Sequence, residues 1–172
     1  MNTRHSIIVA SVITLGITAG ATAQKPAAKA ASAAKRAAST AAAPDGAKVF
    51  ATTCVVCHQI DGAGKEGLYP PLAGSEWVNG DEAKMLRIIL HGLSGPVEVA
   101  GETFSGAMPG WGPVLKDAEI AAVATYIRSS WGNKATAITA AKVTAVRAAT
   151  KSKTTPFTAA ELARVITPAK EE

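Results

Sequence analysis

The sequence contains few cysteines and few aromatic residues. Only Cys54 and Cys57 occur among its 172 residues, so a framework of several disulfide bridges is excluded. Aromatic residues make up 5% of the chain, and much of the 48% hydrophobic content is alanine, which buries little apolar surface. A core built from such residues usually needs an additional covalent or metal-based support.

No apolar stretch in the sequence is long enough to span a bilayer comfortably. The longest, Ser6–Gly20, has about 15 residues, whereas a spanning helix needs ~20. Arg4 precedes it and the small residues Ala21-Thr22-Ala23 follow it, which is the order found in secretory signals. We therefore predict a cleaved signal peptide at residues 1–23 and a periplasmic protein without a transmembrane segment. An uncleaved membrane anchor is the alternative.

The net charge of +5 is unevenly distributed along the chain. Residues 24–43 contain four basic residues and no Leu, Ile, Val or aromatic residue, which predicts a flexible linker without a packing face. Residues 44–132 contain 6 basic and 10 acidic residues, and residues 133–172 contain 7 basic and 3 acidic ones. An acidic middle between basic ends is not a nucleic-acid-binding pattern. Weak contact of the basic ends with a membrane surface is compatible with it.

Hydrophobic periodicity predicts helices and reveals no segment that alternates with period two. The chain is therefore predicted to be all-α with long loops. Residues 92–113, which are rich in glycine and proline, are predicted to be one of these loops, and long ordered loops usually carry function. The expected helices are Ala47–Thr53, Asp81–His91, Asp117–Ser130, residues 139–150, and a short one that begins with the capping box Thr158–Glu161.

The stretch CVVCH, Cys54 to His58, contains both thiols and an adjacent imidazole. A thioredoxin-like redox pair needs a βαβ context, which the sequence does not offer. A structural zinc site needs four ligands, and neighbouring Cys and His side chains suit a tetrahedron poorly. The remaining interpretation is haem attachment, with two thioethers to the porphyrin and His58 as a ligand of the iron. One such motif predicts one covalently bound haem c per chain.

The second axial ligand is predicted to be Met108. It lies in the stretch GAMPGW, where glycines allow the chain to curl and Pro109 stiffens it directly after the methionine. Met85 falls within an apolar helical stretch and is more consistent with core packing. His91 remains a rival ligand, which would give bis-His ligation and a lower reduction potential.

With these residues assigned, residues 44–133 resemble the class I cytochromes c. The order of a short helix, CxxCH, a Gly/Pro loop, a helix, a Met-Pro loop and a last helix is the same. The stretches YPPLAG, LHG, MPGW and YIRSSWGN also resemble the cytochrome subunits of periplasmic quinoprotein alcohol and sugar dehydrogenases. The resemblance implies an all-α fold wrapped around one haem c. Residues 134–172 are then a basic, helical C-terminal extension.

The resemblance also implies individual roles for residues of the pocket. The Pro70 carbonyl would accept the second ring N–H of His58, and Leu72 would line the haem. Trp77 and Trp111 would flank the pocket.

The same resemblance implies that the first and last helices of the domain cross. Gly46 and Phe50 on the first helix would meet the last helix near Tyr126.

The expected function is electron transfer and not catalysis, since two axial ligands leave no open iron position. We expect the chain to accept electrons from a periplasmic dehydrogenase and pass them to an oxidase or a quinone-linked acceptor, as a free shuttle or a complex subunit. A haem enzyme or a gas or peroxide sensor with an open sixth position is the alternative.

Overall fold

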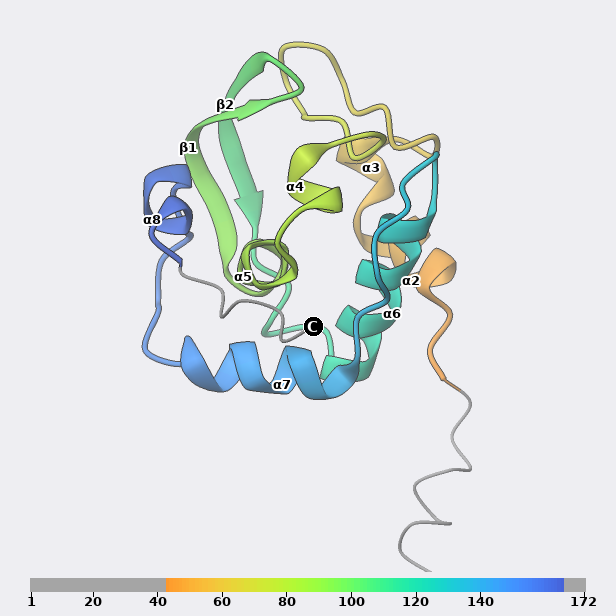
Figure 1. The fold of residues 1–172 in the computed structure, drawn as a ribbon, viewed down its shortest axis with the longest axis vertical. Helices are drawn as coiled ribbons and strands as arrows, with labels where there is room; N and C mark the ends of the chain where they lie inside the picture. Colours follow the sequence, from red (N-terminus) through yellow and green to blue (C-terminus); the bar gives the residue numbers. More distant parts are fainter. Residues whose placement is uncertain (1–42, 166–172) are drawn as a thin grey trace, which may run out of the picture. The chain divides into compact units, whose positions relative to one another are not determined.

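The computed structural model describes residues 43–165 (Figure 1). The predicted signal peptide, nearly all of the predicted linker, and the chain end from residue 166 onward lie outside the described residues. The elements in chain order are α2 (Gly46–Thr53), α3 (Val55–His58), α4 (Glu76–Asn79), α5 (Glu82–His91), β1 (Gly92–Val99), β2 (Glu102–Pro109), α6 (Asp117–Ser129), α7 (Ala140–Ala149) and α8 (Ala159–Ala163). None of the helices described is long and apolar enough to cross a membrane.

All five predicted helices are confirmed, and side-chain caps explain where four of them begin. The carboxylates of Asp45 and Asp81 accept backbone N–H groups in the first turns of α2 and α5. Thr139 caps α7, and Thr158 forms the predicted capping box with Glu161 at the start of α8. The short helices α3 and α4 were not expected from the sequence.

The prediction of an all-α fold with a loop at residues 92–113 is wrong, because β1 and β2 form an antiparallel hairpin there. Ala100 and Gly101 turn the chain with φ of 52° and 81°, the left-handed conformation that two-residue hairpin turns require. Val97 and Val99 alternate with exposed Glu98 and are buried on one face. This alternation is only three residues long, and the surrounding glycines and prolines obscured it.

The main core lies where α2 crosses α6, as the resemblance implied. Gly46 lies so close to α6 that a side chain on it would overlap the Ala122 carbonyl oxygen and the Cβ of Tyr126. Phe50 is fully buried, with its ring 5.6 Å from that of Tyr126 and 5.0 Å from that of Trp131. This crossing holds the N-terminal helix against the rest of the domain.

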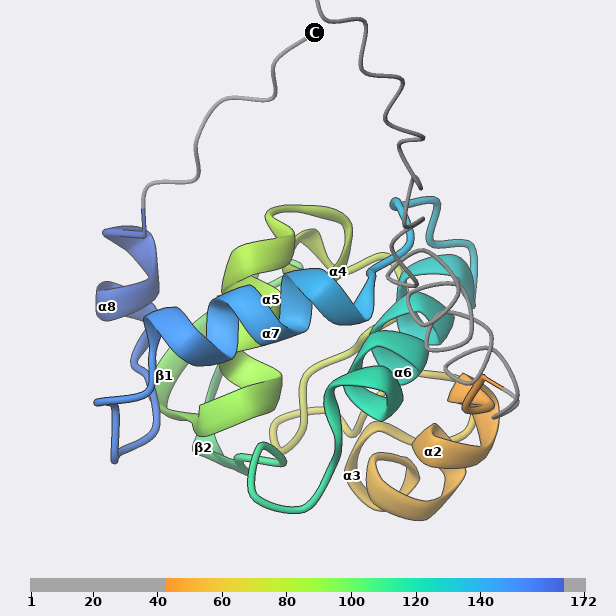
Figure 2. The ribbon, with the colours of Figure 1, turned by 90° about the horizontal axis from the view of Figure 1, so that it is seen from below.

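The described part of the C-terminal extension, residues 134–165, packs on the same domain. Helix α7 lies across α5 and α6 (Figures 1 and 2), with Val143 fully buried beneath it. Further along, Phe157 forms a parallel bridge to Leu93 of β1, and Leu162 of α8 is also fully buried. The extension therefore covers the side of the domain that α5 and the hairpin would otherwise leave open.

Candidate functional site

The two cysteines lie at the junction of α2 and α3. Cys54 follows the last residue of α2 and precedes α3, whereas Cys57 lies within α3, and the two do not form a disulfide with each other. Burial raises the pKa of the Cys54 thiol, and a hydrogen bond at 3.2 Å to the Thr53 hydroxyl opposes the effect only in part. The start of α3 therefore holds Cys54 on a short and defined turn.

His58 is buried and its ring has a fixed orientation. Its Nδ1 lies 3.1 Å from the Pro70 carbonyl oxygen, as the resemblance implied. A carbonyl only accepts, so Nδ1 carries the proton and Nε2 keeps its lone pair. Burial lowers the pKa of His58, which keeps the imidazole neutral and able to act as a ligand. Gly64, at φ of 69°, makes the close approach possible, because a side chain there would overlap the Pro70 carbonyl.

An apolar hollow, here called the main hollow, opens beside His58. It contains about 790 Å³ of space free of protein atoms, part of it open to solvent. Its walls come from α3, the loop after Pro70, α5, the hairpin and α6, and they are almost entirely apolar. The predicted residues that line it are Cys54, His58, Pro70, Leu72, Trp77, Met108 and Trp111.

A second hollow adjoins the main hollow and brings in the other thiol. Cys57 lines this second hollow together with Leu68, Tyr69 and Phe104. His58, Pro70, Leu93, Val97 and Met108 line both hollows. Each cysteine therefore borders one of two hollows that share five lining residues.

Met108 comes from the hairpin and not from a loop. It pairs with Leu93 as the second-last residue of β2, and it is half-buried. Gly92 keeps the two strands close at this point, because a side chain on it would overlap the Met108 carbonyl. The strand pairing thus fixes the backbone that presents the thioether to both hollows.

Two other predicted residues make hydrogen bonds of their own, and only one of them lines a hollow beside His58. His91 lines a separate cleft, where its Nε2 lies 2.7 Å from the Thr150 hydroxyl and its ring packs edge-on against Phe157. The Trp77 indole N–H donates to the Glu98 carbonyl at 2.8 Å, so it ties α4 to β1. Met85 does border the main hollow, but it is buried in the core as expected.

Sequence reasoning missed Asn133, which holds one wall of the main hollow. Its amide nitrogen donates to the carbonyls of Leu72 at 3.0 Å and Ile127 at 2.9 Å. Its amide oxygen accepts from the backbone N–H of Gly74 at 3.0 Å and from the side chain of Asn79 at 2.8 Å. A buried amide that satisfies four partners leaves no periodic trace in the sequence.

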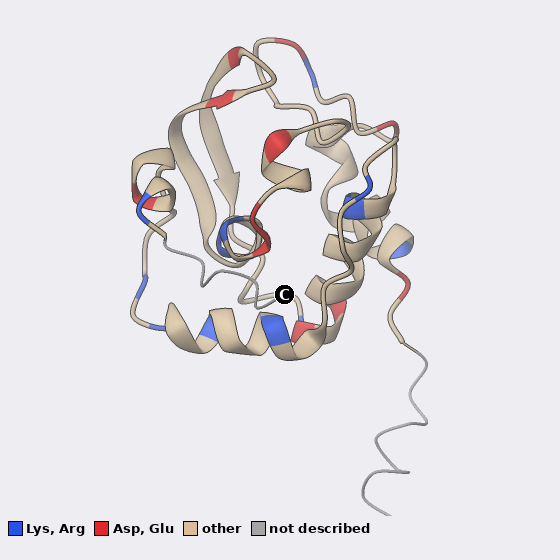
Figure 3. Ribbon diagram, viewed as in Figure 1, with Lys and Arg blue, Asp and Glu red and all other residues tan. Residues whose placement is uncertain are grey.

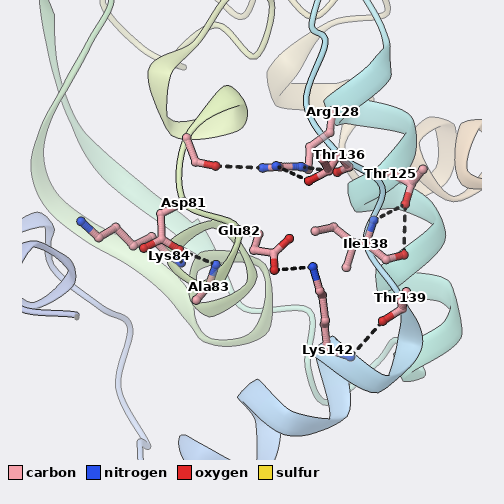
Figure 4. A network of polar contacts seen from close by, with 11 residues as sticks. Asp81, Glu82, Ala83, Lys84, Thr125, Arg128, Thr136, Ile138, Thr139 and Lys142 are labelled. Atoms are coloured by element: carbon pink, nitrogen blue, oxygen red, sulfur yellow. Dashed lines mark hydrogen bonds and ion pairs between the residues drawn. The ribbon is translucent and has the colours of Figure 1, made fainter. Parts of the chain in front are cut away.

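Arg128 has a comparable supporting role and was also missed. This buried guanidinium donates to the carbonyls of Val78, Gly80 and Thr136. Its contact with Thr136 is visible in Figure 4. Burial lowers its pKa, while Glu82 and Asp81 oppose that shift. The contacts connect α6 to the end of α4 and to the turn that follows it. Both helices, α4 and α6, border the main hollow.

The chemistry of this donor set suits a flat apolar group that carries a metal. It offers two thiols for covalent attachment, one neutral imidazole and one thioether around apolar walls. Within residues 43–165, no cluster of three or more His, Cys, Asp or Glu side chains could hold a bare metal ion. The residues fit a bound macrocycle better than a free cation.

Comparison with known proteins gives consistent matches. The family model described as "Cytochrome c" matches residues 43–131. Cytochrome c-552 of Thermus thermophilus is 42% identical over 93 residues, which cover 52% of this chain and 70% of that protein.

Two larger proteins match over a smaller share of their length. The cytochrome c subunit of alcohol dehydrogenase (quinone) from Gluconobacter oxydans is 36% identical over 98 residues, 56% of this chain and 20% of that subunit. The cbb3-type cytochrome c oxidase subunit FixP of Azorhizobium caulinodans is 33% identical over 99 residues, 57% of this chain and 32% of that subunit.

Proposed function

The chain belongs to the cytochrome c family, and on that premise we propose that it is a periplasmic electron carrier with one haem c, ligated by His58 and Met108. Membership of the family makes it an electron-transfer haem protein with covalently bound haem c, and not a catalytic enzyme. The proposal adds the ligands, the number of haems and the cellular location.

The buried His58–Pro70 contact beside the main hollow is the observation that carries the proposal. Cys54 and Cys57 would bind the porphyrin edge, and His58 Nε2 would meet the iron. When bound, haem c supplies an iron that alternates between Fe(III) and Fe(II), so one electron is stored and released. The protein contributes a fixed imidazole, apolar walls formed by residues such as Leu72 and Trp111, and exclusion of water.

Met108 is favoured over His91 as the second axial ligand because of where the two residues lie. Met108 borders both hollows together with His58, whereas His91 lines another cleft and contacts Thr150 and Phe157. A thioether is a soft ligand that stabilises Fe(II) and raises the reduction potential. If His58 and Met108 both bind the iron, no open position would remain for oxygen or peroxide.

The partners of this chain are redox proteins. The names of the matched dehydrogenase and oxidase subunits support a dehydrogenase as donor and an oxidase or quinone-linked acceptor. Acidic residues lie around the hairpin tip and in α4, and Lys and Arg residues lie along α7 (Figure 3). Such an asymmetry would steer a transient encounter, and the attraction would weaken with salt. The predicted signal peptide at residues 1–23 would bring the chain to the periplasm, and its basic ends could add weak membrane contact.

The test is an optical spectrum of the purified full-length protein, oxidised and reduced, with and without carbon monoxide. We expect a low-spin haem c spectrum with the near-infrared iron–methionine band, unchanged by carbon monoxide. The Met108→Ala variant should lose the band and bind carbon monoxide, whereas the matched His91→Ala variant should keep the band. If His91→Ala loses the low-spin spectrum, the ligation is bis-His. A wild-type protein that binds carbon monoxide readily has an open iron, as an enzyme or sensor would.

A further inference from the structure

The segment that follows Met108 leads from β2 to α6 along the main hollow. Residues 109–116, here called the connecting segment, contribute Trp111 and Leu115 to the walls of that hollow. On one side the segment is fixed to the end of α5, where the N–H groups of Trp111 and Gly112 donate to the carbonyls of Ile89 at 2.8 Å and Leu90 at 3.0 Å. The segment continues directly from Met108 and Pro109, the last two residues of β2.

On its other side the connecting segment is held by one side chain of α7. The guanidinium of Arg147 donates from Nη1 to the Gly112 carbonyl at 2.7 Å and from Nη2 to the Leu115 carbonyl at 3.1 Å. Its Nε donates to Asp117 at the start of α6, also at 2.7 Å. A planar guanidinium can address three acceptors in fixed directions, which a lysine ammonium cannot reproduce.

We propose that Arg147 is a positioning residue for Met108. The proposal rests on the proposed function, in which Met108 is a ligand of the haem iron. Arg147 does not line either hollow, so it acts only through the backbone of the connecting segment. It also lies outside residues 43–131, the part that the family model matches. The C-terminal extension therefore supplies a clamp on the ligand that the matched domain does not contain.

The position of α7 does not depend on Arg147 alone. Val143 of the same helix is fully buried, and Lys142 forms an ion pair with Glu82 of α5 (Figure 4). Loss of Arg147 should therefore free the connecting segment while α7 remains docked. The Lys142→Ala variant removes a charged contact between α7 and the core without touching the connecting segment, so it is a matched control.

The experiment compares full-length holoprotein of the wild type, Arg147→Ala, Arg147→Lys and Lys142→Ala. Imidazole is titrated while the near-infrared iron–methionine band is followed, because imidazole can bind the iron only when Met108 leaves it. Hydrogen exchange at the amides of Trp111 and Gly112 is measured in the same samples. We expect at least tenfold tighter apparent imidazole binding in Arg147→Ala, equivalent to about 1.4 kcal/mol, and at least tenfold faster exchange at both amides. Arg147→Lys should show nearly the same imidazole affinity and amide exchange as Arg147→Ala, and Lys142→Ala should resemble the wild type in both.

The possible outcomes separate the inference from the function on which it rests. A wild-type protein that lacks the band would overturn the His58/Met108 ligation and the inference with it. A wild type with the band, combined with equal imidazole affinity and equal amide exchange in Arg147→Ala and Lys142→Ala, would overturn the inference alone. If Arg147→Ala does not fold, Arg147→Lys decides by the same two readouts, because a normal band and normal exchange in it would contradict a role for the guanidinium fork.

Discussion

Replacing Asn133, just after α6, by alanine should destabilise the domain strongly. The wild-type side chain is 4% exposed and joins three parts of the chain: the loop at Leu72–Gly74, α4 and the last turns of α6. Alanine leaves the carbonyls of Leu72 and Ile127 and the N–H of Gly74 without their partner.

The size of the effect follows from the number of contacts. A net contribution of about 1 kcal/mol for each of four hydrogen bonds gives about 4 kcal/mol. Asn79 is exposed, so water can replace its contact, which reduces the expected loss to about 3 kcal/mol. That is a large part of the 5–15 kcal/mol by which domains of this size are usually stable, so the variant should fold but only marginally.

The assay is equilibrium urea unfolding of the holoprotein. With a slope of about 2 kcal/mol per molar, a loss of about 3 kcal/mol lowers the midpoint by about 1.5 M. Ser129→Ala is the control, since Ser129 is exposed near the end of the same helix and bonds only carbonyls within it, and it should change stability by less than about 0.5 kcal/mol. A loss below about 1 kcal/mol in Asn133→Ala would refute the reasoning, because water would then satisfy the freed groups.

Three further substitutions test other parts of the structure. Hydrogen bonds from Thr144, first, and then Arg147 lower the pKa of Asp117. The ionised form of Asp117 therefore contributes stability above its ordinary pKa near 3.8, and this contribution is lost as the pH falls through the lowered value. The free energy of unfolding of Asp117→Asn should consequently fall less steeply at acid pH than that of the wild type. Gly46→Ala should cost about 2–4 kcal/mol in thermal or urea unfolding, because its Cβ would overlap the Ala122 carbonyl. Ala100→Gly should raise the free energy of unfolding by about 0.5–1 kcal/mol, because glycine adopts the left-handed turn without strain.

Each of these substitutions has a control or a contrary result. Gly106→Ala should be almost neutral, since the nearest atom to its Cβ would be 4.0 Å away, and equal losses at Gly46 and Gly106 would contradict the close-packing argument. If the stability of Asp117→Asn and of the wild type falls equally at acid pH, Thr144 and Arg147 do not stabilise the ionised form of Asp117. If Ala100→Gly is less stable than the wild type, the added conformational entropy of the unfolded chain outweighs the backbone strain relieved in the turn.

The helices could be predicted from the sequence because their signals are local. A capping residue such as Asp81 or Thr158 lies next to the turn it caps, and apolar residues at 3–4 spacing follow within the same helix. The hairpin could not be recognised, because its alternation covers only Val97 to Val99 and its turn begins with Ala100, which is uncommon at a left-handed position.

The candidate site was predictable only where its residues form a short motif. Cys54, Cys57 and His58 are contiguous, and Met108 stands beside Pro109, so composition and spacing identify them. Their roles as haem ligands stay predictions, as do the domain boundaries. The residues that hold the walls of the site, Asn133 and Arg147, could not be predicted in this way. They donate to backbone carbonyls 61 and 35 residues away, and no sequence pattern indicates such pairs.

The pairing of Phe157 with β1 also bears on how the chain behaves at high concentration. The N–H of Ser94 donates to the Phe157 carbonyl and the N–H of Phe157 to the Gly92 carbonyl, so part of the outer edge of β1 already has a partner. An exposed strand edge is a template for strands of other molecules, and proteins commonly cover or interrupt such edges to avoid aggregation. A chain truncated before Phe157 would present that edge to its neighbours. The C-terminal extension thus covers part of a strand edge that would otherwise be open to intermolecular sheet growth.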